Sequence, residues 1–206
     1  MVDYQTAVAK SLLDIAAVKL QPNDPFTWAS GIKSPIYTDN RKTISFPDAR
    51  RIIIDGLVTL IKEQYPDVAV IGGVATAGIP HAAWVAEKLD LPMIYVRSKP
   101  KDHGTGKQIE GVLAAGQKVV LIDDLISTGG SVLGAVKATQ AAGGEVLGVA
   151  AIFSYELPAA TMNFAQAATP FSSLTNFSSL IQVAQQTGEL TAEELTLIAD
   201  WHRTLE

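Results

Sequence analysis

The most constraining feature of the sequence is a regular alternation, beginning at Pro47, between helical patterns and short apolar runs. Apolar runs of this kind are typical of a parallel sheet that is buried on both faces, with helices as the connections between strands. The pattern therefore predicts an α/β fold in which a doubly wound, mostly parallel sheet is flanked by helices. The helices are expected near 48–64, 79–88 and 130–142, and the strands at 68–73, 93–97, 118–123 and 145–153.

The segments before and after this alternation are less regular. Residues 3–19 carry apolar residues close to helical spacing, which predicts an amphipathic helix. Phe26–Tyr37 combines aromatic residues with Ser-Gly and Ser-Pro pairs, which are typical of short extended pieces and turns. We expect residues 1–206 to form a single domain in which residues 1–45 are a small N-terminal hood. Further helices are expected over 158–167, over 176–186, and after the capping-box pattern at Thr191–Glu194.

The composition argues against several classes of site. A formal net charge of −5 is unlike a nucleic-acid-binding surface, which normally needs a broad basic patch. The chain has no cysteine, and its three histidines, His81, His103 and His202, lack the close spacing of metal ligands. No apolar run reaches the ~20 residues of a membrane span. We therefore expect a cytoplasmic protein that binds neither nucleic acid nor a membrane and holds no structural zinc.

One segment joins an apolar strand to two acids and then to a loop of small residues that opens a helix. The strand at 118–123 runs into Asp123 and Asp124, and Ser127–Ser131 follows with two glycines. Strand ends in open α/β sheets point into the ligand crevice, and a helix N-terminus favours a phosphate. The acids are expected to accept hydrogen bonds from sugar hydroxyls, while residues 128–131 surround a phosphate. An ordinary glycine-rich turn with accidental acids is the alternative interpretation.

A second segment concentrates positive charge. Residues 97–107 contain four Lys or Arg residues and His103 against one acid, Asp102, in a chain that is acidic as a whole. Glycines at 104, 106 and 111 make a stable helix improbable, so the segment can close over an anion. Taken alone, it is also compatible with a solvated charged loop.

A third segment, Gly72–Pro80, lies between an expected strand and an expected helix. Its small residues allow backbone N–H groups to approach a diphosphate. Neither of the common glycine-rich nucleotide-binding patterns fits these positions, so a tight turn without a ligand is the alternative.

These segments resemble the type I phosphoribosyltransferases, which bind 5-phosphoribosyl 1-pyrophosphate (PRPP). Asp123–Ser131 resembles their PRPP signature, and Gly72–Pro80 resembles their pyrophosphate loop. Arg97–Gly104, continued by Gln108–Gly111, resembles the catalytic loop of the orotate phosphoribosyltransferases, as residues 26–41 resemble their base-covering lobe. The resemblance implies transfer of the phosphoribosyl group from PRPP to N1 of orotate. The products are orotidine 5'-phosphate and pyrophosphate, in de novo pyrimidine (UMP) biosynthesis.

The resemblance also implies roles for individual residues. Arg97, Lys101 and His103 match the catalytic residues, which contact the pyrophosphate of PRPP. Ser127 and Lys33 are the candidates for binding orotate. Mg²⁺ is the implied cofactor, held mainly through PRPP without a direct metal ligand from the chain. The catalytic loop of this family reaches the neighbouring subunit, which implies a homodimer with shared active sites. The PRPP site further comprises Asp123, Asp124, Leu125, Ile126, Ser127, Thr128, Gly129, Gly130 and Ser131, and the pyrophosphate loop comprises Ala75, Thr76, Ala77 and Gly78.

The chain departs from the family pattern at three places. Ala29 stands where several relatives have a lysine, and Thr76 and Ala77 stand where some have an aromatic residue and a lysine. Some relatives have an arginine after the strand near Phe153, where this chain reads Phe-Ser-Tyr-Glu. The group that recognises the orotate carboxylate is therefore not assigned.

Two other functions stay open. One is a phosphoribosyltransferase for another base, such as uracil or a purine, against which the N-terminal lobe and the His103 loop argue. The other is a PRPP-sensing regulator without catalysis, against which the acidic balance and the lysine-containing loop argue.

Overall fold

The computed structural model describes residues 2–27, 33–99 and 108–204. Its centre is a six-stranded sheet of order β10-β9-β8-β5-β6-β7, in which only β7 runs antiparallel to its neighbour. The strands are β5 (Val70–Val74), β6 (Met93–Val96), β7 (Ile109–Glu110), β8 (Lys118–Ile126), β9 (Glu145–Ser154) and β10 (Phe171–Asn176).

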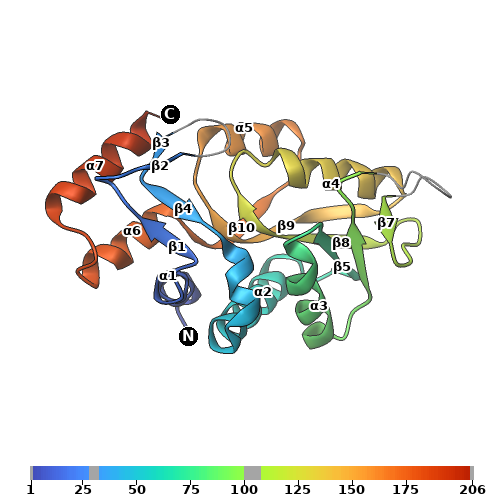
Figure 1. The fold of residues 1–206 in the computed structure, drawn as a ribbon. Coiled ribbons are helices and arrows are strands. Elements are labelled where there is room, and N and C mark those ends of the chain that lie inside the picture. The colour runs from blue at the N-terminus through green and yellow to red at the C-terminus, as the bar shows by residue number, and fades with distance from the viewer. Residues whose placement is uncertain (1, 28–32, 100–107, 205–206) are drawn as a thin grey trace.

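Helices cover both faces of this sheet (Figure 1). On one face lie α1 (Tyr4–Asp14), α2 (Pro47–Gln64) and α3 (Gly78–Leu89), and on the other lie α4 (Gly130–Ala141) and α5 (Pro158–Gln166). The predicted doubly wound α/β fold is confirmed. No helix in the described ranges is both long and apolar enough to cross a membrane.

The strand at the centre of the sheet shows why the apolar runs are continuous. Val119 and Leu121 of β8 pack in the core beneath α4 and α5, whereas Val120 and Ile122 pack in the core formed with α1, α2 and α3. All four side chains are fully buried. Because successive side chains of a strand point to opposite faces, a strand covered on both sides needs apolar residues at every position.

The strand order positions the ligand crevice. From β5 the chain passes to β6 on one side, and then returns to β8, β9 and β10 on the other side. The carboxyl ends of β5 and β8 therefore flank the point at which the winding reverses. In open α/β sheets this is where ligands bind.

The N-terminal segment adds two small sheets. β1 (Val18–Leu20) pairs with β4 (Ile36–Thr38), β2 (Phe26–Thr27) pairs with β3 (Lys33–Ser34), and the short 3-10 helix η1 (Asn40–Ser45) follows.

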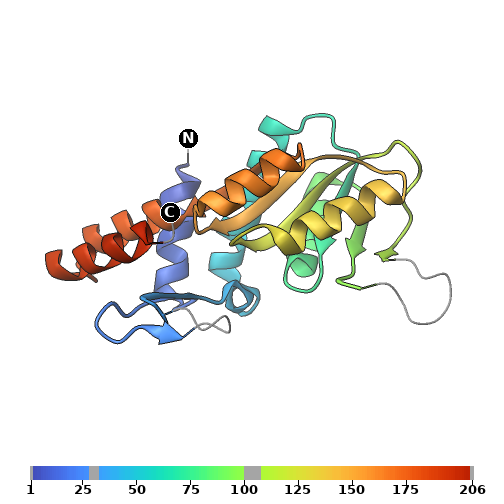
Figure 2. The same cartoon turned by 90° about the horizontal axis from the view of Figure 1, so that it is seen from above.

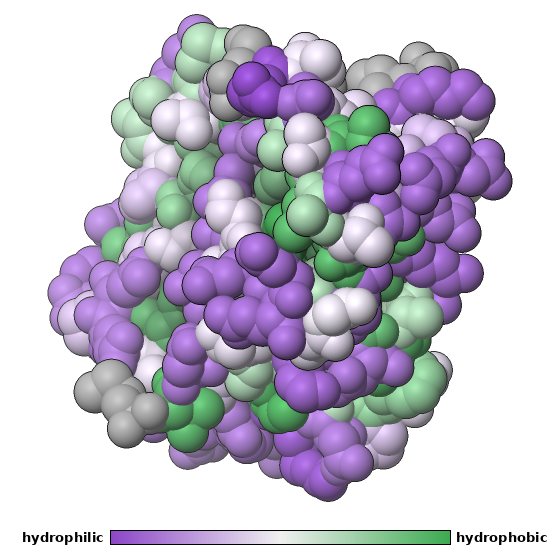
Figure 3. Space-filling view, turned by 90° about the vertical axis from the view of Figure 1, so that its left-hand side faces the viewer, coloured by the Kyte–Doolittle hydropathy of each residue, from purple (hydrophilic) through white to green (hydrophobic). Residues whose placement is uncertain are grey.

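The C-terminal helices α6 (Phe177–Gln186) and α7 (Ala192–Arg203) lie at the same end of the molecule as these strands (Figures 1 and 2). Trp201 Nε1 donates to the carbonyl oxygen of Lys33 at 2.8 Å, and Asn23 Nδ2 donates to Glu194 Oε1 at 2.9 Å. The outer surface of this end is mainly hydrophilic, with apolar residues in small patches (Figure 3). Segments from both halves of the chain thus form one lobe beside the sheet.

Three differences from the expected elements have physical reasons. The first helix ends at Asp14 instead of continuing to residue 19, because Ala16 adopts a left-handed backbone (φ 52°) and the next residues pair with β4. β8 continues to Ile126, three residues beyond its expected end at 123, because β9 pairs with it as far as Ser154. The edge strand β10 was not expected, since its Phe-Ser-Ser-Leu-Thr-Asn sequence is mostly polar. The capping box at Thr191 and Glu194 is confirmed.

Candidate active site

Two aspartates of β8 form the centre of the candidate site. Asp123 is buried and Asp124 is half-buried, and both lie within the strand, ahead of its carboxyl end. The backbone N–H of Asp124 donates to Asp123 Oδ1 at 2.9 Å. Asn40 of η1 donates from Nδ2 to the backbone carbonyl of Asp124 at 2.6 Å, so the N-terminal segment is attached directly to the acid pair.

The environment of this pair disfavours two negative charges. Burial, and then repulsion from Asp124, raise the pKa of Asp123 above its ordinary value. Burial also raises the pKa of Asp124. Buried carboxylates in this state gain from hydrogen-bond donors or from a cation. The pair is therefore suited to accept hydrogen bonds from the hydroxyl groups of a sugar.

The loop after β8 forms a small hollow at the start of α4. Its volume is about 130 Å³, and Gly129 adopts a left-handed backbone (φ 81°) immediately before the helix. A side chain on Gly129 would lie 2.6 Å from Cε2 of Phe164, so only glycine fits. Asn163 of α5 donates to the carbonyl oxygen of Thr128 at 2.9 Å and so fixes the loop from the other side. The hollow is lined by Asp123, Leu125, Ser127, Thr128, Gly129, Gly130, Ser131 and Val132.

This hollow provides what a phosphate needs. The first N–H groups of α4 have no partner within the helix, and the helix dipole favours negative charge at this end. The predicted residues from Ser127 to Ser131 are thus brought together with Asp123. Ile126 is fully buried in the apolar core, which leaves only its main chain available to a ligand.

A neighbouring cavity of about 220 Å³ connects the phosphate loop to two other predicted segments. Gly130 and Ser131 line both cavities. On the opposite side lie Ala75 of the loop after β5 and Arg97 at the end of β6. The described residues that line it are Val74, Ala75, Val96, Arg97, Ser98, Gln108, Gly130, Ser131, Gly134 and Ala135.

Contacts with neighbouring parts of the chain hold Arg97 and the loop after β5 in place. Arg97 pairs weakly with Glu110 (Nη1 to Oε1, 3.5 Å), and its backbone carbonyl accepts a hydrogen bond from Gln108 Nε2 at 3.1 Å. The Ala75–Thr76 peptide bond is cis. Gly78 has no room for a side chain, because a Cβ there would collide with the backbone carbonyl of Ile122. The loop and the start of α3 therefore lie directly against β8, next to Asp123.

The remaining predicted residues either do not line these two cavities or lie outside the described ranges. Lys33 lies on β3, where Nζ donates to Thr27 Oγ1 at 2.7 Å. Lys101 and His103 lie outside the described residues, as does Ala29. Within the described ranges, no three His, Asp or Glu side chains are grouped so that they could hold a metal ion.

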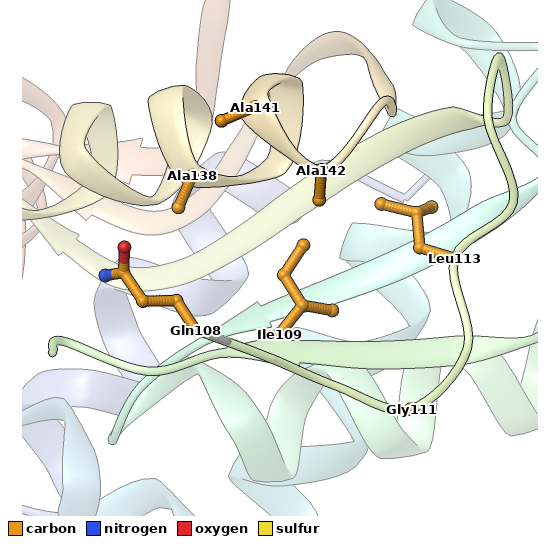
Figure 4. A pocket seen from close by; sticks show the side chains of 7 residues that line it. All are labelled: Gln108, Ile109, Gly111, Leu113, Ala138, Ala141 and Ala142. Atoms are coloured by element: carbon orange, nitrogen blue, oxygen red, sulfur yellow. The ribbon is translucent and has the colours of Figure 1, made fainter. Parts of the chain in front are cut away.

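A further cavity of about 430 Å³ lies between β7 and α4 (Figure 4). Aliphatic side chains and Gln108 surround it. None of the described residues that line it carries a charge, so this part of the lining offers a phosphate no ionic partner. Its lining is Gln108, Ile109, Gly111, Leu113, Ala138, Ala141 and Ala142.

Asn40 is a site residue that the sequence reasoning missed. It is 1% exposed, and the contact with Asp124 joins residues 84 positions apart. Thr43 Oγ1 donates to the backbone carbonyl of Asn40 at 2.6 Å and lies 3.4 Å from Nε2 of the buried His81 on α3. The only sequence signal was that Asn40 falls within the segment 26–41, which resembles the base-covering lobe.

Comparison with known proteins agrees with this geometry. The sequence model of the family "Phosphoribosyl transferase domain" matches residues 45–163. The chain is 62% identical to an orotate phosphoribosyltransferase of Lactiplantibacillus plantarum over 206 residues, which cover 100% of this chain and 97% of the relative. It is 58% identical to that of Streptococcus mutans over 199 residues, which cover 97% and 95% of the two chains.

Solved structures lead to the same family. The orotate phosphoribosyltransferase of Aeropyrum pernix superimposes with a TM-score of 0.77 at 27% identity, covering 89% of this chain and 99% of that one. That of Mycobacterium tuberculosis in complex with PRPP superimposes with a TM-score of 0.67 at 25% identity, covering 87% and 99%. The chain belongs to the phosphoribosyltransferase family, and within it to the orotate phosphoribosyltransferases.

Proposed function

We propose that this protein transfers the 5-phosphoribosyl group from PRPP to N1 of orotate, giving orotidine 5'-phosphate and pyrophosphate. One observation carries the proposal beyond family membership. Asp123, the phosphate loop, Ala75 and Arg97 all border two adjoining cavities at the reversal point of the sheet, and Asp124 follows Asp123 on β8. PRPP has a matching arrangement of a ribose, a 5'-phosphate and a pyrophosphate.

The roles follow from the charge that each part of PRPP carries. Thr128–Ser131 binds the 5'-phosphate through backbone N–H groups at the start of α4. Asp123 and Asp124 accept hydrogen bonds from the ribose hydroxyls and lie near the positive charge that develops at C1 as the bond to pyrophosphate stretches. The backbone of Ala75–Gly78, with Arg97, faces the departing pyrophosphate.

On the basis of the family resemblance, the proposal assigns Lys101 and His103, together with Arg97, to contact with the departing pyrophosphate. The leaving pyrophosphate gains negative charge in the transition state, so cations that reach it there lower the barrier more than they tighten ground-state binding. Closure of the segment 97–107 would also exclude water, which otherwise hydrolyses PRPP.

The donor set fits Mg²⁺ that arrives with PRPP. A buried and a half-buried carboxylate, both with raised pKa values, supply oxygen atoms and gain from a nearby cation. Asp123 and Asp124 are the residues that would face the metal, which the oxygens of PRPP mainly hold. When bound, Mg²⁺ neutralises charge on the diphosphate.

Three further parts of the proposal rest on the family resemblance. The active form is a homodimer in which the segment 97–107 of one subunit contributes to the site of its partner. The enzyme acts in the cytoplasm, and its product leads to UMP in pyrimidine biosynthesis.

A spectrophotometric assay tests the proposed reaction. Loss of the ultraviolet absorbance of orotate is followed with PRPP and Mg²⁺ together, and with each omitted. We expect orotate consumption only when both are present. Consumption of uracil or a purine in place of orotate would assign a different base, and binding of PRPP without turnover of any base would refute catalysis.

A further inference from the structure

The proposed reaction needs a group that recognises the carboxylate of orotate, and the inference below rests on that proposed function. The segment after β9, where some relatives have an arginine, does not supply a cation in this chain. Glu156 stands there. Its Oε2 accepts two hydrogen bonds from Ser178, one from the backbone N–H at 2.9 Å and one from the side-chain hydroxyl at 2.5 Å. This acid caps the start of α6 and would repel a substrate carboxylate.

Several cations near the N-terminal lobe already have other partners. Lys33 Nζ donates to Thr27, and Lys42 Nζ donates to the backbone carbonyl of Ala16 at 2.9 Å. The guanidinium of Arg50 lies 4.6 Å from the ring centre of Trp84. Each of these cationic side chains already interacts with a neighbouring group in its own part of the fold.

Arg41 differs because the chain holds it beside the acid pair. Its neighbour Asn40 is buried and bound to the backbone of Asp124, and Thr43 fixes the same turn of η1. The side chain of Arg41 is 65% exposed, and its Nε donates to Asp39 Oδ1 at 2.6 Å. Among the described residues, neither terminal nitrogen of Arg41 has a hydrogen-bond partner.

The electrostatics agree with this position. The hydrogen bond and charge of Asp39 raise the pKa of Arg41, and the charges of Tyr37 and Asp124 add to the effect. The guanidinium thus lies within the field of the residue that is proposed to hold the ribose, on the side of the N-terminal lobe. A base attached to that ribose would come within reach of the same group.

We propose that Arg41 binds the carboxylate of orotate through its two terminal nitrogens, and that Asp39 orients the guanidinium by holding Nε. The planar fork of arginine matches a carboxylate in two parallel hydrogen bonds. The function of Arg41 is then to select orotate over bases that have no carboxylate, such as uracil. Its contact with Asp39 is a positioning contact and leaves the outer edge of the fork available.

The test compares Arg41→Gln and Arg41→Lys with Arg51→Gln. Arg51 is a matched control because it is also exposed and paired with an aspartate, Asp48, but lies on α2. Steady-state kinetics give KM for orotate and for PRPP, and competition experiments give the inhibition constant of uracil. Folding of each variant is checked by thermal melting.

Arg41→Gln should raise KM for orotate about 10-fold to 100-fold, as expected for loss of a charge-assisted pair. KM for PRPP and the inhibition constant of uracil should change less than about threefold, because neither involves the carboxylate. Arg41→Lys should lie between the wild type and Arg41→Gln, since lysine keeps the charge without the fork. Arg51→Gln should match the wild type.

Two results would overturn the inference. An unchanged KM for orotate in Arg41→Gln would show that another group binds the carboxylate. Equal losses of affinity for orotate, PRPP and uracil would show that Arg41 acts on the sugar phosphate or on the overall charge of the site, and not on the carboxylate. These outcomes differ from failure of the proposed function, in which the wild type itself would not consume orotate.

Discussion

Replacing Gly129 by alanine probes the loop at the start of α4 through two separable costs. Gly129 adopts φ 81°, where an L-residue with a side chain costs about 1–2 kcal/mol. Its added Cβ would also lie 2.6 Å from Phe164, which is buried and stacked on Phe171 with ring centres 4.3 Å apart. Forcing a methyl group into such packing costs about 1–3 kcal/mol. The expected loss is therefore about 2–5 kcal/mol, a large share of the ~5–15 kcal/mol that stabilises a typical domain.

Gly116 provides the matched control. Its backbone has φ 77°, almost the same as that of Gly129, but a Cβ there would meet no atom within 4 Å. Gly116→Ala should therefore cost only the backbone term of about 1–2 kcal/mol. Urea unfolding of both variants measures the difference, and calorimetry with PRPP should show weaker binding for Gly129→Ala alone.

A double-mutant cycle with Phe164→Leu isolates the contact itself. If the methyl group collides with the ring, shortening that side chain should recover at least about 1 kcal/mol in the Gly129→Ala background beyond additivity. Equal losses of stability for Gly129→Ala and Gly116→Ala would refute the steric argument. Unchanged PRPP affinity in a destabilised Gly129→Ala protein would refute the role of this loop in binding the phosphate.

Three further predictions concern the proposed chemistry. Lys101→Ala should lower kcat by about 10² or more with an unchanged thermal melt, as for a transition-state donor, and near-wild-type turnover would remove Lys101 from the mechanism. Asp124→Asn should weaken PRPP binding more than orotate binding in calorimetry, whereas equal losses would contradict its ribose role. The pKa of Asp123 is raised from its ordinary 3.8 to about 8 in the folded state, so the folded state binds more protons between these values and this residue costs stability increasingly as the pH rises through that window. Asp123→Asn should therefore gain stability relative to the wild type with rising pH in urea titrations, and a constant difference across pH would contradict the burial of this charge.

The parts of the fold that could be predicted from sequence are those decided by local pattern. The apolar run of β8 predicted a strand buried on both faces, and Thr191 with Glu194 predicted the start of α7, because both signals arise within a few residues. The first helix was predicted too long, since pairing of Val18–Leu20 with β4 outweighs the helical spacing of its apolar residues. β10 was missed, since its position beside β9 compensates for its polar residues.

In the candidate site, too, contacts that arise from local sequence could be predicted, and contacts that depend on the packing of distant segments could not. The grouping of Asp123 with the loop from Ser127 to Ser131 follows from the geometry of a strand followed by a helix, and it was expected. The attachment of Asn40 to Asp124, by contrast, depends on how the N-terminal lobe docks on the sheet. No local spacing encodes that contact, so the position of Arg41 became visible only in three dimensions.

The hydrogen bond between Trp201 and Lys33 has a consequence for the order in which parts of the chain fold during translation. The two residues are 168 positions apart, so α7 emerges from the ribosome long after β3. The strands of the central sheet are synthesised in between, and domains begin to fold during translation. The nascent chain can therefore form the central sheet, with Asp123, Asp124 and the loop at the start of α4, before the lobe beside the sheet is complete. Contacts of such long sequence separation form slowly, which makes docking of α7 a late step in maturation.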